Sequence, residues 1–218
     1  MYQGIEKGDR LKSILQCIVF AAAIGSASAQ VTIVQVTSGT GIAGAYFGES
    51  FTTPAGGAWN HITFNFYATA ASGSTPASTP AAAGTAFLLT QEYLGTPAAL
   101  SSSTPGFLAQ SISNAGGVYT FPPSVVLNPN TQYWVYENAL MIATGNGSAG
   151  TPAQFAYFSS TATSNFVTFG GTQVANFLVA GNGGVAATPL PSSLLLTVLG
   201  VGCLALFQAR RKGFRLAR

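Results

Sequence analysis

The sequence predicts an all-β protein whose central part is a single, jelly-roll-like β-sandwich. Short runs rich in β-branched and aromatic residues recur through residues 30–180, separated by clusters of Gly, Pro, Ser, Thr and Asn. This pattern is typical of sandwiches and barrels, and no helical period interrupts it. The sequence also carries one apolar segment at each end, with lengths and flanking charges that indicate targeting rather than a core.

Residues 1–29 have the features of a secretory signal peptide. Basic residues precede an apolar run over 14–24, and Ala27 and Ala29 stand directly before Gln30. A helix of this run would be about 16 Å long, too short for a bilayer core of about 30 Å. We therefore expect cleavage after Ala29 rather than a retained anchor.

Eight strands are expected between the two ends. They are Val31–Thr37, Ile62–Tyr67, Ala86–Tyr93, Val118–Phe121, Gln132–Ile142, Gln154–Phe158, Phe166–Phe169 and Val174–Val179. In the second of these, alternation places Ile62, Phe64 and Phe66 on a core face. The alternate residues, His61, Thr63, Asn65 and Tyr67, are expected to face solvent.

Two further features shape the predicted domain. The run Tyr133–Tyr136 is apolar on both faces, which indicates a central strand covered on both sides. Residues 68–84 are low in complexity and rich in Thr-Pro, which predicts a mobile surface loop, with O-glycosylation as the alternative. Residues 181–189 are expected to form a flexible linker.

Residues 190–207 predict a transmembrane helix. They contain no charge, and eighteen residues give about 27 Å of helix, enough to span a bilayer. The basic tail, residues 208–218, should stay cytoplasmic and so place the domain outside the membrane, in agreement with the signal peptide.

The charges lie almost entirely at the two ends. Lys and Arg are absent between Lys12 and Arg210, and residues 30–209 also lack Asp, so their only charged residues are Glu49, Glu92 and Glu137. A nucleic-acid partner is excluded because phosphate binding needs clustered cations. Both cysteines, Cys17 and Cys203, fall in the targeting segments, which excludes disulfides and cysteine-ligated metals from the domain.

The sequence points to no catalytic, metal or cofactor site. Without Asp, a Ser-His-Asp triad is impossible, and no Gly-x-Ser-x-Gly motif is present. Three isolated glutamates are typical of solvated positions rather than of a glycosidase pair, and a single histidine is too few for zinc. The remaining candidate is a set of aromatic and amide residues suited to neutral sugars, with ordinary core aromatics as the alternative: Trp59, Asn60, His61, Asn65 and Tyr67.

The C-terminal end resembles the PEP-CTERM sorting signal of exported bacterial proteins. That signal joins a short Pro-containing motif, an apolar span and an Arg-rich end. The matching positions are Pro189, Leu190 and Pro191, then residues 194–207, then Arg210, Arg211 and Lys212. Leu190 stands where the family has Glu. The resemblance implies an exosortase-type sorting enzyme as a partner.

The middle of the chain is similar to bacterial choice-of-anchor β-sandwich modules. The similarity lies in Ser50–Thr53, Trp59–Ile62 and Leu127–Trp134, the last of which reads Leu-Asn-Pro-Asn-Thr-Gln-Tyr-Trp. The resemblance implies no catalytic residues.

Together the composition, the two terminal segments and these resemblances predict an exported, non-enzymatic surface or exopolysaccharide-associated protein, held at least transiently in the membrane. The alternative is a carbohydrate-binding module for neutral extracellular polysaccharide.

The charge distribution makes a testable prediction about residues 30–187. Because they contain no cation other than a protonated His61, their carboxylates must be solvated or bonded to neutral donors. The melting temperature should therefore be nearly equal in about 20 mM and about 500 mM NaCl, since screening has almost no ion pair to weaken. Mild acid should be tolerated as well. A shift of more than about 5 °C would reveal an electrostatic interaction or bound ion that the charge pattern misses.

Overall fold

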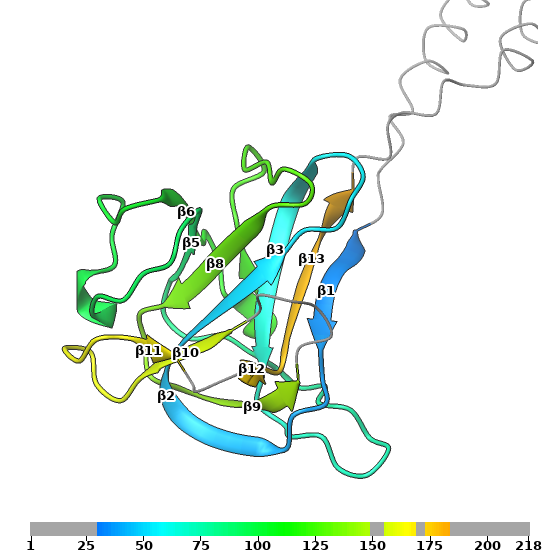
Figure 1. The fold of residues 1–218 in the computed structure, drawn as a ribbon, viewed down its shortest axis with the longest axis vertical. Coiled ribbons are helices and arrows are strands. Elements are labelled where there is room, and N and C mark those ends of the chain that lie inside the picture. The colour runs from blue at the N-terminus through cyan, green and yellow to red at the C-terminus, as the bar shows by residue number, and fades with distance from the viewer. Residues whose placement is uncertain (1–29, 149–154, 169–172, 184–218) are drawn as a thin grey trace, which may run out of the picture.

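Two antiparallel sheets face each other in the part of the chain that this computed structural model describes, residues 30–148, 155–168 and 173–183, consistent with a β-sandwich (Figure 1). Within these residues, no helix has the length and apolar character needed to cross a bilayer. The predicted signal peptide (1–29), transmembrane helix (190–207) and basic tail (208–218) lie outside the described residues, as does the predicted linker beyond Gly183.

The strands run in chain order as follows: β1 (Val31–Val36), β2 (Gly41–Thr52), β3 (Trp59–Tyr67), β4 (Pro80–Ala81), β5 (Ala86–Leu89), β6 (Phe107–Gln110), β7 (Tyr119–Thr120), β8 (Gln132–Glu137), β9 (Met141–Ser148), β10 (Ala156–Ser159), β11 (Val167–Thr168), β12 (Gln173–Ala175) and β13 (Phe177–Gly183). Two single 3₁₀ turns, Pro97–Ala99 and Ala115–Gly117, interrupt the loops. The first sheet has the order β1-β13-β3-β4, with β7 also on β3. The second has the order β11-β10-β2-β8-β5-β6, with β9 on β2 and β12 on β9.

The longest strand, β2, is absent from the strands expected from the sequence. Its second half pairs with β8 between Gly48 and Thr52, whereas its first half pairs with β9 between Gly41 and Ala45. The glycines of this stretch resemble turn signals in the sequence. One of them, Gly48, is required by packing, because a Cβ there would overlap the Tyr136 ring.

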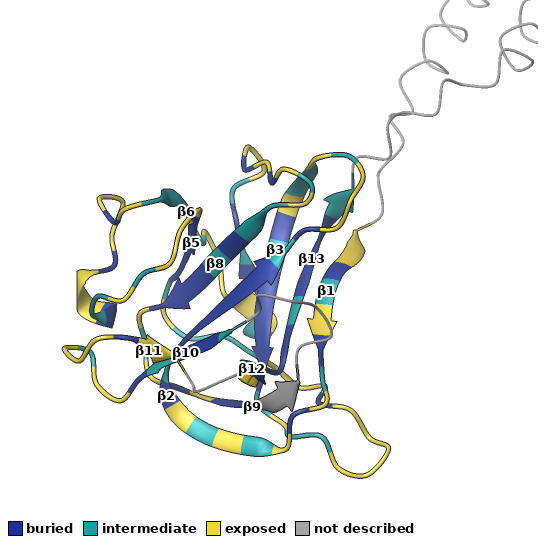
Figure 2. Cartoon of the chain, in the orientation of Figure 1, coloured by how far each residue is buried: buried dark blue, intermediate teal, exposed yellow. Residues whose placement is uncertain are grey.

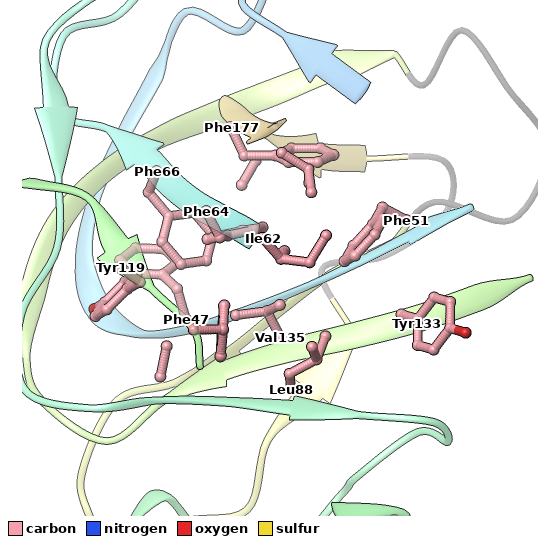
Figure 3. Close-up of a cluster of buried hydrophobic side chains, with 14 of the residues drawn as sticks. Phe47, Phe51, Ile62, Phe64, Phe66, Leu88, Tyr119, Tyr133, Val135 and Phe177 are labelled. Atoms are coloured by element: carbon pink, nitrogen blue, oxygen red, sulfur yellow. The ribbon is translucent and has the colours of Figure 1, made fainter. Parts of the chain in front are cut away.

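The main core lies between the sheets and confirms the predicted core face of β3. Ile62, Phe64 and Phe66 are at most 1% exposed. The Phe64 ring stacks on Phe177 with centroids 5.7 Å apart, and Phe66 lies 5.7 Å from Phe47 of the opposite sheet (Figure 3). Burial of such aromatic side chains contributes on the order of 2–3 kcal/mol each.

The prediction that β8 is central is also confirmed. The strand lies between β2 and β5, and both of its faces are covered (Figure 2). Tyr133 and Val135 point into the main core. Tyr136 belongs to a second cluster on the outer face of the same sheet, with Trp134 packed against it.

Several predicted strands end earlier than expected or are broken. The expected run Gln132–Ile142 is interrupted after Glu137, where the chain turns from β8 into β9. The run Val174–Val179 is interrupted at Asn176, which separates β12 of one sheet from β13 of the other. The expected strand Ala86–Tyr93 stops at Leu89, while β13 continues into the predicted linker as far as Gly183.

The segment predicted as a surface loop, residues 68–84, is partly paired. Pro80 and Ala81 form β4 against β3, and Ala77 is 2% exposed. The main-chain N–H groups of Ala71 and Ala77 donate hydrogen bonds to the carbonyls of Gly39 and Thr37. These bonds fasten the loop over the connection between β1 and β2.

A buried polar junction holds the point where the chain passes from β12 to β13. The Asn176 amide bonds to both main-chain groups of Gly39, with N···O distances of 2.8 Å. Its Nδ2 also donates to Thr144 Oγ1 at 2.7 Å, and that hydroxyl donates to the Tyr67 carbonyl. Asn176 and Thr144 are buried, so their hydrogen bonds satisfy polar groups that no water reaches.

Candidate functional site

The five residues predicted to bind sugars all lie on β3 but do not form one surface. Trp59 is half-buried and packs against the main core, with its ring close to Gly183 of β13. Its main chain exchanges two hydrogen bonds of 2.8 Å with Leu127. The Trp59 Nε1 is buried without a hydrogen-bond partner among the described residues, so the ring serves packing more than polar recognition.

Asn60 and His61 are the polar members of this set that reach solvent. Asn60 is partly exposed and His61 exposed, and Asn60 Oδ1 lies 2.9 Å from His61 Nδ1. His61 has a φ of 49°, in the left-handed region, beside a register shift in the pairing of β3 with β13. The irregular backbone turns the imidazole away from the sheet and toward solvent.

Asn65 and Tyr67 depart from the expectation of a solvent-facing side. They are 3% and 5% exposed. Tyr67 is covered because Gln35 of β1 reaches over it and donates from Nε2 to the Tyr67 hydroxyl at 3.0 Å. Asn65 donates from Nδ2 to the Phe66 carbonyl at 2.9 Å. The expectation that these residues face solvent is therefore wrong at Asn65 and Tyr67, and neither side chain can contact a ligand at the surface.

A second aromatic group, on the outer face of the second sheet, was missed as a candidate. Trp134 of β8 pairs with Ser50 of β2, and Phe155 lies on the other side of Ser50, bonded to it through its N–H and carbonyl. Trp134 and Phe155 are half-buried, as Trp59 is, with the small Ser50 between them. The apolar character of both faces of Tyr133–Tyr136 was the signal in the sequence, since it placed aromatic residues outside the core as well as inside.

Polar groups accompany this outer aromatic face, which we define as Trp134, Phe155, Tyr157 and Glu92. The indole Nε1 of Trp134 donates to the Tyr157 hydroxyl at 3.1 Å. Burial raises the pKa of Tyr157, the indole bond opposes this, and the neighbouring Glu92 carboxylate adds to it. Glu92 is exposed, and it is the single charged side chain at the surface of the described residues. Aromatic rings beside hydrogen-bonding groups of this kind suit a neutral sugar.

The other two glutamates are buried in the main core. Glu137 is 0% exposed, and its two carboxylate oxygens accept hydrogen bonds from the N–H groups of Phe47 (2.7 Å) and Ala139 (2.9 Å). Burial raises the pKa of Glu137 to about 8, and the two N–H groups oppose the shift. Of the two environments expected for the glutamates, solvent or neutral donors, Glu137 has the second, because main-chain N–H groups supply the donors.

Glu49 is as fully buried as Glu137 but has fewer hydrogen bonds to its carboxyl group. It is 0% exposed; Oε2 accepts from the Ala175 N–H at 2.7 Å, and Oε1 has no hydrogen-bond partner among the described residues. Burial raises its pKa well above the ordinary value, opposed by the N–H groups of Ala175 and Ser50. Enclosed carboxyls with raised pKa values also occur in active sites, but neither Glu49 nor Glu137 is among the described residues that line the cavity between β2, β9 and β12.

One cavity of ≈ 90 Å³ opens between β2, β9 and β12. It is small beside the roughly 300–1,000 Å³ of pockets that bind drug-sized ligands. Its described lining has no charged side chain: Gly41, Ile42, Ala43, Phe47, Ala143, Thr144, Gly145, Ala156, Gln173, Val174 and Ala175. The described residues also contain no group of three or more His, Cys, Asp or Glu side chains placed to hold a metal ion.

The chain matches no family model, no curated protein and no solved structure at a significant level.

The buried glutamates make the stability of the domain depend on pH in a defined direction. The unfolded chain loses the Glu137 proton near the ordinary pKa of 4.5, whereas the folded chain keeps it until about pH 8. The stabilising contribution is therefore complete below about pH 4.5 and is lost as the pH rises through 8. The free energy of unfolding should fall by about 1.4 kcal/mol per pH unit for each such group. Urea unfolding between pH 4.5 and 8 measures this slope.

A Glu137→Gln variant separates this titration from the packing of the side chain. The amide keeps the shape but has no proton to lose, so the slope should become shallower even where the variant is less stable at every pH. An unchanged slope, or stability that rises with pH in the original chain, contradicts the assignment.

Proposed function

We propose that the chain is an exported, non-enzymatic component of a bacterial cell surface or exopolysaccharide-rich matrix, sorted by a PEP-CTERM-like tail. The observation that carries the proposal is the contrast between the ends and the domain. Apolar segments with basic flanks stand at both ends, whereas residues 30–209 contain no Lys, Arg or Asp. In this proposal a jelly-roll-like sandwich lies between a cleaved signal peptide and a transmembrane helix, and an exosortase-type enzyme acts at the tail.

The chemistry of the described residues supports a non-enzymatic role. Glu49 and Glu137 are enclosed, and both are hydrogen-bonded to main-chain N–H groups. Neither can reach a glycosidic bond unless the sandwich opens. The surface of the described residues has one charged side chain, Glu92, and therefore a low net charge. Low net charge favours a protein held at a surface over one free at high concentration.

A second function, binding of neutral extracellular polysaccharide, is favoured by one specific observation. The outer aromatic face combines the half-buried side chains of Trp134 and Phe155 with the exposed Glu92 carboxylate. A sugar ring stacks on an aromatic ring through its C–H face, and its hydroxyls donate to carboxylates. The exposed pair Asn60 and His61, beside the half-buried Trp59, offers a smaller alternative surface on β3.

Cell fractionation with N-terminal sequencing tests the export proposal. The expected product begins at Gln30 and is found in the envelope or the medium. Mass spectrometry of its C-terminus decides between a retained tail and one cut near Pro191. A full-length product that starts at Met1 and stays in the cytoplasm contradicts the proposal.

A glycan array tests the binding function and locates it. We expect Trp134→Ala to abolish binding to a neutral polysaccharide while the chain stays folded, because the variant removes one wall of the aromatic face. Trp59→Ala is the matched comparison, since it removes the other tryptophan from the opposite sheet. Loss of binding with Trp59→Ala alone would place the binding site on β3 instead. If the original chain binds no neutral glycan, the binding function is contradicted and the structural role alone is left.

A further inference from the structure

β1 is the longest strand that lies wholly at a margin of the described sheets. It has six residues and pairs only with β13. The other strands at the sheet margins are shorter: β4, β7 and β11 have two residues each, β12 has three and β6 has four. β4 also contains Pro80, which cannot donate to a further strand. Figure 1 shows β1 at the margin of the sandwich, beside β13.

The sequence of β1 lacks most of the features that protect edges. Its residues, Val-Thr-Ile-Val-Gln-Val, include no charge and no proline, and five of the six are β-branched. Edge strands are ordinarily blocked by charges, proline, bulges or covering loops. Here a register shift between Thr32 and Val34 is present, and the 68–84 loop contacts the strand at its end, through the Thr37 carbonyl. Val31, Thr32 and Gln35 remain exposed.

Electrostatics favours a second copy of the chain as the occupant of this edge. Like charges opposed across a strand pair disfavour pairing, but the described surface carries one charged side chain, Glu92. Glu92 contacts Tyr157 of the second sheet, whereas β1 belongs to the first. The described part of a second copy therefore brings no charge to the edge, and its β1 offers the same open row of main-chain donors and acceptors.

We propose that β1 pairs antiparallel with β1 of a second copy, so that the first sheets of two molecules join into one continuous sheet. The pairing is isologous and closes on itself as a two-fold dimer. Val31 pairs with Gly181, so both ends of the described domain lie at the same end of this sheet. The two-fold axis then places the chain ends of the two copies on opposite sides of the dimer. Two copies anchored in one bilayer through the proposed helix 190–207 could not pair in this way, so the pairing applies to the chain released from the membrane or solubilised in detergent.

Disulfide trapping in the full chain tests the geometry. With Cys17 and Cys203 changed to Ala, single cysteines are introduced at Thr32, Val34 and Gln35, and at the exposed loop residue Ile112 as control. In an antiparallel pair, each residue away from the two-fold axis adds about 7 Å between equivalent positions, and a disulfide needs Cα atoms within about 7 Å. We expect dimers to peak at one β1 position and to fall at the others.

Equal trapping at all three β1 positions would indicate a parallel arrangement and overturn the proposal, as would trapping at β1 no stronger than at Ile112→Cys.

A charge variant gives an independent readout. Lys at the β1 position that traps most strongly opposes two ammonium groups across the two-fold axis and should weaken dimerisation of the detergent-solubilised full chain by about two- to fivefold, whereas Ile112→Lys should not. Sedimentation measures the mass and thermal melting checks the fold. A chain that sediments as a monomer without substitution also overturns the proposal.

Discussion

The absence of cationic partners for carboxylates is the constraint on which the interior of this domain depends. Residues 30–209 contain neither Lys nor Arg, yet Glu49 and Glu137 are fully buried. A buried carboxylate without a counterion is costly unless hydrogen bonds compensate it. In this fold main-chain N–H groups supply part of the compensation, and burial still raises the pKa of both glutamates. Such N–H groups can donate to a carboxylate only where the regular ladder leaves them free.

The positions of the two glutamates follow from that requirement. Phe47 lies where β2 changes its partner from β8 to β9, and its N–H donates to Glu137. Ala175 lies at the register shift between β12 and β9, and its N–H donates to Glu49. Each carboxylate thus replaces a carbonyl that the interrupted ladder does not supply. Asn176 does the same with a neutral amide one residue later, where it bonds to both main-chain groups of Gly39. The two glutamates thus fasten strands of the second sheet to each other where those strands change partners. Asn176 lies where the chain passes from the second sheet to the first.

The features that were predictable from the sequence are those governed by local patterns of apolar residues. The alternation of Ile62, Phe64 and Phe66 and the doubly apolar run around Val135 gave the correct core face and the correct central strand. β2 was missed because its glycines resemble turn residues, and their purpose is visible only once Tyr136 lies over Gly48. The burial of Asn65, Tyr67 and the glutamates could not be predicted from the sequence either. It depends on Gln35, Ala175 and other residues that are distant in the chain. Of the residues predicted to bind sugar, the exposed pair Asn60 and His61 and the half-buried Trp59 keep access to solvent.

Glu137 is held in the protein interior, and its hydrogen-bond donors among the described residues are main-chain N–H groups. Its carboxyl carbon can be followed by NMR during a pH titration and assigned by comparison with Glu137→Gln. We predict a midpoint of about pH 8, because burial outweighs the two N–H bonds. A midpoint at or below the ordinary value of 4.5 would contradict it, since it would show that the carboxylate is either solvated or paired with a cation.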